Sequence, residues 1–238
     1  MIKPYYQNKW VAILKGDCRQ ILPQLDVREY FPHLTENKVD LVVTDPPYFL
    51  PNTQFRPEMR MASRMWSNFT FAQTAFEQYL NLFLSVASNN FEFYLFTDEL
   101  SYAVVYPILY ANFYQSKLLV WDKQSIGLGG KWRRQFELLI YSYRGNPQHN
   151  GSHTDIIQCK RVKDKEHPYE KPEELIKQIL NASQTNLILD PFLGSGTTCF
   201  CAKKLNRYSI GIEIEEKYCE IAARRCSQEV MEFSNNEG

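Results

Sequence analysis

Short apolar runs alternate with amphipathic stretches along this chain, a pattern typical of strands alternating with helices. Runs rich in Val, Ile, Leu and aromatic residues predict seven strands, at residues 11–14, 39–44, 91–96, 117–121, 136–143, 187–190 and 208–213. Helical periodicity predicts helices up to residue 25 and over 71–87, 99–110, 172–182, 197–205 and 215–231. This order predicts an α/β fold with a doubly wound, mostly parallel sheet, in a single domain over residues 1–238.

Two polar stretches interrupt the alternation. Residues 49–67 show no clear period and leave directly from the strand at 39–44, and residues 144–166 contain few apolar side chains. Long loops inside a compact domain usually carry function. We therefore expect two exposed loops at these positions.

The composition fits a folded protein whose core needs neither disulfides nor a metal to hold it together. With 238 residues, of which 44% are hydrophobic, the chain can bury a full core. No stretch approaches the roughly 18 apolar residues of a membrane span, and no secretion signal is seen at the start, so we expect a cytoplasmic protein with no membrane contact. The six cysteines show no C-x-x-C spacing and the four histidines are scattered, which predicts reduced thiols and no metal site.

Charge gives only local information. The formal net charge is zero, which neither suggests nor excludes nucleic acid, because a phosphate backbone responds to local patches. Cations do gather in three stretches, comprising Arg56, Arg60 and Arg64; Lys131, Arg133 and Arg134; and Lys160, Arg161, Lys163 and Lys165. Each is a candidate contact surface, with an ordinary solvated face as the alternative.

A glycine-containing connection between a strand and a helix predicts a cofactor site. In Phe192–Gly196, small residues allow a ligand to approach the backbone and the start of the next helix. Asp190 ends the preceding strand, and Glu213 ends the next one 23 positions later, near the spacing of a carboxylate that binds a ribose. The alternative is a structural turn with a solvent-facing Glu213.

Two features of this connection disfavour a dinucleotide. Cys199 replaces the third glycine of the dinucleotide fingerprint, which argues against a nicotinamide-dependent oxidoreductase. Asp190 would repel a pyrophosphate but suits a cationic ligand. A sulfonium cofactor therefore fits better.

The segment Asp45-Pro46-Pro47-Tyr48 predicts a site for an exocyclic amino group. Asp45 and the Pro46 carbonyl can each accept one N–H of that group, and the prolines hold the turn rigid. Tyr48 can stack on a base. An ordinary turn that ends a strand is the alternative.

These motifs resemble those of the S-adenosylmethionine-dependent amino-methyltransferases of DNA, in the permuted group whose catalytic motif precedes its cofactor motif. Residues 45–48 match D-P-P-Y and residues 190–198 match D-P-F-x-G-S-G-T-T. Three shorter matches follow the family order, at Gly16-Asp17, Trp121-Asp122-Lys123 and 167–172 (H-P-x-x-K-P). The resemblance implies a seven-stranded Rossmann-like methyltransferase sheet, with 49–67 and 144–166 as candidate target-recognition or DNA-contact segments.

The resemblance also assigns roles to site residues. Asp45, Pro46, Pro47 and Tyr48 would be catalytic. Glu213 would bind the ribose, and Asp17 would accept from the adenine amino group of the cofactor unless it is an ordinary strand-end cap. Lys171 would line the cofactor pocket unless it is a surface cation at a helix start. The remaining cofactor-binding residues would be Cys18, Pro172, Asp190, Phe192, Gly194, Ser195, Gly196, Thr197 and Thr198.

The implied reaction is direct methyl transfer to adenine N6 in double-stranded DNA, after the nucleotide is flipped out of the duplex. No cysteine follows a proline, as a ring-carbon methyltransferase would require. Cytosine N4 is the alternative acceptor, although those enzymes more often carry Ser in place of Asp45. A catalytically silent nucleic-acid-binding homologue and a protein-glutamine methyltransferase are further alternatives. Because the recognition region is small, a short target sequence, a homodimer or a separate recognition subunit is expected, in a restriction-modification setting.

Overall fold

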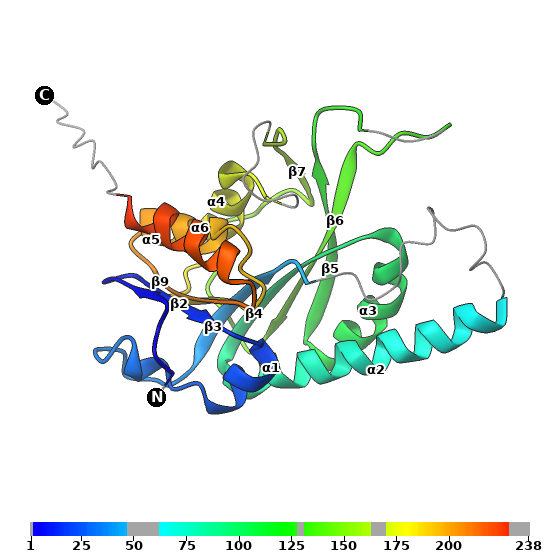
Figure 1. The fold of residues 1–238 in the computed structure, drawn as a ribbon. Helices are drawn as coiled ribbons and strands as arrows, with labels where there is room; N and C mark the ends of the chain where they lie inside the picture. Colours follow the sequence, from blue (N-terminus) through cyan, green and yellow to red (C-terminus); the bar gives the residue numbers. More distant parts are fainter. Residues whose placement is uncertain (1, 47–61, 128–130, 163–169, 229–238) are drawn as a thin grey trace, which may run out of the picture.

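A single twisted sheet organises the chain (Figure 1). The computed structural model describes residues 2–46, 62–127, 131–162 and 170–228, and within 62–69 only the backbone. The sheet has nine strands among these residues, in the order β1-β2-β9-β8-β3-β4-β6-β5-β7. Their bounds are β1 Tyr6–Gln7, β2 Val11–Lys15, β3 Val39–Thr44, β4 Ala87–Thr97, β5 Gln115–Asp122, β6 Phe136–Arg144, β7 Ile156–Gln158, β8 Leu187–Asp190 and β9 Tyr208–Glu213.

The five neighbouring strands β2, β9, β8, β3 and β4 pair in parallel, in that order across the sheet. Strand β6 is antiparallel to both β4 and β5. The predicted α/β fold with a mostly parallel sheet is therefore confirmed. The predicted number of strands was wrong, because the edge strands β1 and β7 were missed. They are two and three residues long, too short to produce a periodicity. Because β7 lies at Ile156–Gln158, the stretch 144–166 is not a loop throughout.

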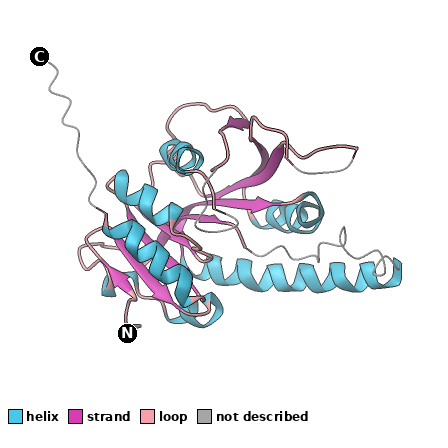
Figure 2. Cartoon of the chain, turned by 45° about the horizontal axis from the view of Figure 1, so that its top comes forward, coloured by secondary structure: helices cyan, strands magenta, loops and turns pink. Residues whose placement is uncertain are grey.

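Two layers of helix cover the sheet. They are α1 Cys18–Ile21, α2 Ala62–Val86, α3 Glu99–Asn112, α4 Glu173–Ala182, α5 Thr197–Lys204 and α6 Glu216–Ser227, with 3₁₀ turns η1 Leu22–Gln24 and η2 Val27–Glu29. Strand β4 shows how the faces divide: Phe91, Phe93 and Leu95 pack in the core under α2 and α3, whereas Tyr94 and Phe96 pack under α4. The two helical layers are visible on opposite faces in Figure 2.

Helix α2 differs most from its prediction. It begins at Ala62 rather than near residue 71, so residues 62–67 of the predicted loop are helical. The sequence from 62 to 70 contains neither Pro nor Gly, which allows a helix to continue without a periodic apolar face. The rest of that predicted loop, 49–61, lies outside the described residues. The helix predicted up to residue 25 is instead one short α-helix followed by a 3₁₀ turn that contains Pro23.

The sheet has a topological switch point between the parallel strands β3 and β8, where the helices that follow the two strands lie on opposite faces. These strands are hydrogen-bonded neighbours, yet the chain continues from β3 into α2 on one face and from β8 into α5 on the other. Open α/β sheets bind ligands at the carboxyl end of such a switch point. No helix in the described part of the chain is long and apolar enough to span a membrane.

Candidate active site

The two motifs meet at the carboxyl edge of the sheet. Asp45 follows β3 and Asp190 ends β8, and these strands pair side by side through Leu41 with Ile188 and Val42 with Leu189. The negative charge of Asp45 acts on Asp190. Sequence positions 145 residues apart are thus brought to one site by the parallel pairing.

Asp45 lies in a half-buried network of alternating charges. Lys171 Nζ is 2.7 Å from Asp45 Oδ2 and also binds Glu137 Oε1, and Lys123 Nζ is 2.8 Å from Glu137 Oε2. The Lys171 ammonium also lies over the Phe96 ring, 4.6 Å from its centroid. The alternative of Lys171 as a surface cation is therefore wrong. Its partner in the structure is the predicted catalytic carboxylate.

Burial and the two lysines set the protonation of this network. Burial raises the pKa of Asp45, and Lys171 partly offsets that effect. Burial alone would raise the pKa of Glu137, but the two lysines hold it below its usual value. Burial would lower the pKa of Lys171, yet the two carboxylates raise it, so Lys171 stays charged. The result is an Asp45 carboxylate whose orientation is fixed from one side by Lys171.

Asp190 is buried in a different way, with hydrogen bonds rather than cations. It is 6% exposed, and its Oδ1 accepts from Phe192 N at 3.1 Å while its carboxylate accepts from the Thr198 hydroxyl. Burial raises the pKa of Asp190 to about 7, the Thr198 and Phe192 hydrogen bonds oppose this, and the nearby carboxylates of Asp45 and Glu213 add to it. Among the described residues, no lysine or arginine pairs with Asp190.

Glu213 holds the glycine turn in place. Its Oε2 accepts from Gly194 N at 2.8 Å and its Oε1 from Glu215 N at 2.8 Å. It is 9% exposed, so the alternative of a solvent-facing side chain is wrong. Gly196 adopts a positive φ of 83°, and a Cβ there would lie 2.7 Å from the Ala222 Cβ of α6. The turn therefore needs glycine for both backbone and packing reasons.

Asp17 lies at the neighbouring end of β2, where Gly16 N donates to the Glu213 backbone carbonyl. Its side chain caps α1 by accepting from Arg19 N at 2.8 Å, and it pairs with the Arg19 guanidinium. The alternative of a strand-end cap is thus present, and the role toward a cofactor adenine stays a prediction. The Cys18 thiol packs in the core beneath, and burial raises its pKa to about 11.

Most of the remaining residues predicted to bind the cofactor lie around the start of α5. Thr197 accepts from Arg225 at 3.1 Å, so of the two threonines it is Thr198 that reaches Asp190. Ser195 is buried within the turn, and Pro172 forms the N-cap of α4. Phe192 packs edge to face on Tyr79 of α2, with centroids 5.4 Å apart. This contact joins α2, on one face of the sheet, to the turn that is predicted to bind the cofactor.

Some predicted residues lie outside the described part of the chain. These are Pro47, Tyr48, the cations Arg56 and Arg60, and residues 163–169, which include the start of the H-P-x-x-K-P match and the cations Lys163 and Lys165. All six cysteines are buried and unpaired, as predicted. Cys199 and Cys201 pack in different core clusters, so they point to different faces of α5. Within the described ranges no group of three potential ligands is placed to hold a metal.

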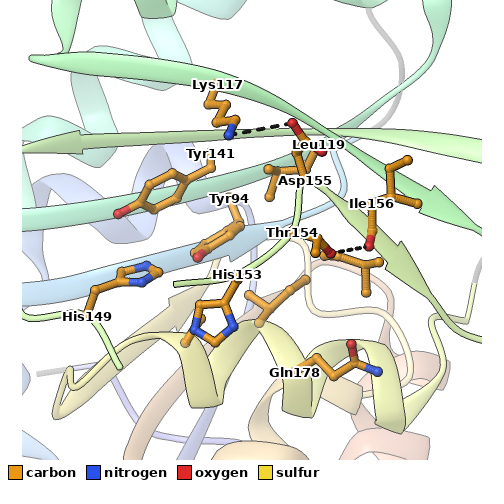
Figure 3. A pocket seen from close by; sticks show the side chains of 13 residues that line it. Tyr94, Lys117, Leu119, Tyr141, His149, His153, Thr154, Asp155, Ile156 and Gln178 are labelled. Carbon is orange, nitrogen blue, oxygen red and sulfur yellow. Dashed lines mark hydrogen bonds and ion pairs between the residues drawn. The ribbon is translucent and has the colours of Figure 1, made fainter. Parts of the chain in front are cut away.

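Sequence reasoning missed Glu137 and a second buried carboxylate, Glu92. Glu92 is fully buried and accepts from Tyr141 Oη at 2.9 Å and from the Ser183 hydroxyl, and His149 Nε2 lies 3.3 Å away. Beside it opens the pocket of Figure 3, lined by residues that include Tyr94, Tyr141, His149, His153 and the ion pair of Lys117 with Asp155. None of the predicted site residues lines that pocket. Glu92 and Glu137 are each a single glutamate within an apolar strand, and their partners lie far away in the sequence. No local motif therefore indicates which residues they contact.

Comparisons with known proteins agree with this geometry. A family model of DNA methylases matches residues 120–224. The Type II methyltransferase M.HpaI of Haemophilus parainfluenzae is 27% identical, over 85% of this chain and 73% of its own length. The Type II methyltransferase M.HinfI of Haemophilus influenzae is also 27% identical, over 94% and 70%.

Solved structures share the fold at lower identity. The M1.HpyAVI–SAM complex superposes with a TM-score of 0.66 at 22% identity, covering 90% of this chain and 99% of that one. The PvuII DNA methyltransferase, described as cytosine-N4-specific, gives 0.73 at 15% identity, covering 94% and 88%. The fold is thus the Rossmann-like fold of the methyltransferases, as the motifs predicted. The family model and the two relatives support an amino-methyltransferase, without separating N6 from N4.

Proposed function

We propose that this chain transfers a methyl group from S-adenosylmethionine to the exocyclic N6 amino group of a flipped-out adenine in double-stranded DNA. The observation that carries the proposal is the pairing of two unlike carboxylate sites at the β3–β8 switch point. Asp45 is a carboxylate oriented by Lys171, whereas Asp190 and Glu213 form a negative site without paired cations among the described residues. The first suits an amino group and the second a cationic cofactor.

The donor set fits S-adenosylmethionine on chemical grounds. Its sulfonium supplies an electrophilic methyl group and one positive charge. Asp190, kept partly protonated by burial, would hold the charged end of the cofactor. Glu213 already binds Gly194 N through one oxygen, and its carboxylate lies where a ribose hydroxyl would donate. M1.HpyAVI, which shares this fold, was solved as a SAM complex.

Asp45 and Pro46 would orient the acceptor nitrogen. One N–H of the amino group would donate to the Asp45 carboxylate and the other to the Pro46 carbonyl, which turns the nitrogen lone pair toward the methyl group. As the N–C bond forms and the S–C bond breaks, the nitrogen gains positive charge, and the proton it then loses passes to solvent. The Asp45 carboxylate stabilises that charge, because its own negative charge lies close to the nitrogen. Tyr48 would stack on the base.

DNA as the acceptor follows from the relatives, which are named as Type II and DNA methyltransferases. Adenine follows from Asp at position 45, where cytosine-N4 enzymes more often carry Ser. We also propose a restriction-modification setting, with a homodimer or a separate recognition subunit completing target recognition. The permuted order of the motifs belongs to this proposal.

The test is transfer of labelled methyl from S-adenosylmethionine to unmethylated genomic DNA, followed by nucleoside analysis. N6-methyladenine is the expected product. N4-methylcytosine as the product would be consistent with the proposed mechanism but would refute adenine as the target base. Label that enters RNA or protein instead of DNA would overturn the proposed acceptor, and no transfer to any of them would favour a silent binding protein.

A further inference from the structure

The connection between β5 and β6 presents an aromatic side chain to solvent at the end of the molecule. Trp132 is 94% exposed and Ile126 is 61% exposed. Both views show this connection projecting away from the body of the sheet (Figures 1 and 2). A single exposed apolar residue is ordinary on a protein surface. Trp132 differs from an ordinary exposed residue because its neighbours in the sequence, Lys131 and Arg133, are both cations.

Every charged side chain of this connection is positive. Residues 123–136 contain four cations, Lys123, Lys131, Arg133 and Arg134, and no acidic residue. Lys123 and Arg134, which lie next to the strands, form ion pairs with Glu137 and Glu99. Lys131 and Arg133, which flank Trp132, have no acidic partner among the described residues. The outer part of the connection is therefore an aromatic ring between two uncompensated cations.

The connection is anchored to the candidate active site. Lys123, its first residue, binds Glu137, and Glu137 binds the same Lys171 that holds Asp45. Hydrogen bonds continue the hairpin past the strands: Lys123 N donates to Gln135 O at 3.0 Å, Gly127 N to Arg134 O at 2.7 Å, and Arg133 Nε to Gly127 O at 2.9 Å. The described residues of the connection, 123–127 and 131–135, are thus held at the same edge of the sheet as Asp45.

We propose that Lys131, Trp132 and Arg133 form a duplex-contacting surface beside the target nucleotide. This rests on the proposed function. The two cations contact phosphates on either side of the site, and Trp132 stacks on a base that loses its neighbour when the target flips out. An aromatic ring between cations fits nucleic acid better than a protein partner, whose contact patch would need a larger apolar centre with fewer charges.

The first test compares aromatic variants on one hairpin. Trp132→Ala is expected to raise the dissociation constant for a fluorescent duplex about tenfold, because one base loses its stacking partner. Trp132→Phe should fall between that variant and the wild type. The matched control is Tyr114→Ala, because Tyr114 precedes β5 at the opposite end and is 82% exposed. Its affinity should stay at the wild-type value. Anisotropy with S-adenosylhomocysteine present measures all four proteins.

The second test separates phosphate binding from stacking. The double variant Lys131→Gln/Arg133→Gln should reduce the slope of log affinity against log salt by about 2, because each cation removed leaves one phosphate without its protein partner. Trp132→Ala should weaken binding without changing that slope. A thermal melt of each variant checks that the fold is intact, which is expected because these side chains are exposed.

The outcomes separate this surface from the catalytic proposal. Equal duplex affinity for wild type and Trp132→Ala, or no duplex binding by the wild type, would overturn the surface whether or not methyl transfer occurs. Duplex binding that depends on Trp132 without methyl transfer by the wild type would support the surface and overturn the catalytic proposal. An equal loss in Tyr114→Ala would show a general effect of removing exposed rings, and would also overturn the surface.

Discussion

Two carboxylates buried on the α4 face of the sheet are stabilised in opposite ways. Asp45, at the carboxyl edge, is neutralised by a lysine that also binds Glu137. Glu92, on β4 further from that edge, is surrounded by the hydroxyls of Tyr141 and Ser183 and by His149. Burial raises the pKa of both carboxylates. Asp45 is therefore balanced mainly by one ammonium group, whereas Glu92 is balanced mainly by hydroxyl donors, with weaker electrostatic support from His149 and Arg207.

The difference indicates what each site can do. Two hydroxyl donors and His149 surround Glu92 and leave little capacity for a ligand, and Ser183, which caps α4, ties that helix to the sheet. A single lysine on one side of Asp45 leaves the other side of the carboxylate able to accept from an amino group. Because a buried charge is costly without a partner, the lysine maintains the carboxylate in the absence of substrate.

The largest effect is expected at Asp45. Asp45→Ala should reduce methyl transfer by at least ~10²–10³-fold, because the acceptor of the amino group is lost. Cofactor binding should largely survive, and the fold should tolerate the change because Glu137 still neutralises Lys171. Transfer kinetics and calorimetric binding measure the two effects. The control is Asp155→Ala, which breaks the exposed pair with Lys117. An equal loss of cofactor binding would refute the assignment of Asp45 to the base.

Removal of the lysine should come next. Lys171→Met leaves two buried carboxylates with one fewer cation, which should cost about 3–5 kcal/mol of unfolding free energy. In the absence of Lys171 the pKa of Asp45 rises further, so the acid limb of the transfer rate should move to higher pH. Lys171→Arg should restore part of both effects. If the Met variant unfolds, the pH profile of Lys171→Arg alone tests whether Lys171 sets the pKa of Asp45. An unchanged profile with weaker cofactor binding would return Lys171 to the cofactor pocket.

Cofactor binding should depend on pH through Asp190. Its pKa of about 7 means that the free protein holds a proton there at lower pH. A cationic ligand favours the carboxylate, so the proton is released on binding and affinity should increase by up to about tenfold in total as the pH rises from about 6 to 8. S-adenosylhomocysteine, which lacks the sulfonium charge, should show a weaker dependence. An equal slope for both ligands, or a slope that persists in Asp190→Asn, would contradict this role.

The smallest effect is expected at the second cluster. Tyr141→Phe removes a hydroxyl donor from Glu92 Oε1 and should cost about 1–3 kcal/mol of unfolding free energy. The folded-state pKa of Glu92 is raised, so stability falls as pH rises through it, and the deficit should be larger at pH 8 than at pH 4. Methyl transfer should be unaffected. Tyr143→Phe is the control on the same strand, and denaturant titrations measure both variants. Equal losses in the two would assign the effect to ring packing.

The sequence predicted the elements that repeat a pattern and missed those that do not. Seven strands followed from apolar runs, because buried parallel strands are apolar throughout. Strand β7 depends on its pairing with β5, which no local periodicity reveals. Asp45 and Asp190 were found because strand-end motifs are local. Glu137 was missed because its ion pair with Lys171 depends on register across β4, β5 and β6.

The strand order also affects how the chain assembles on the ribosome. Strand β2 pairs with β1 and β9, and β3 reaches β9 only through β8. Strand β3 can pair with β8 once residue 190 has been synthesised, whereas β1 and β2 can join the rest of the sheet only through β9, which ends at residue 213. The strand that carries Asp45 is therefore complete on the nascent chain well before the strands that carry Asp190 and Glu213. Under the proposed function, the nascent chain could not bind its cofactor, or transfer a methyl group, until β8 and β9 are in place.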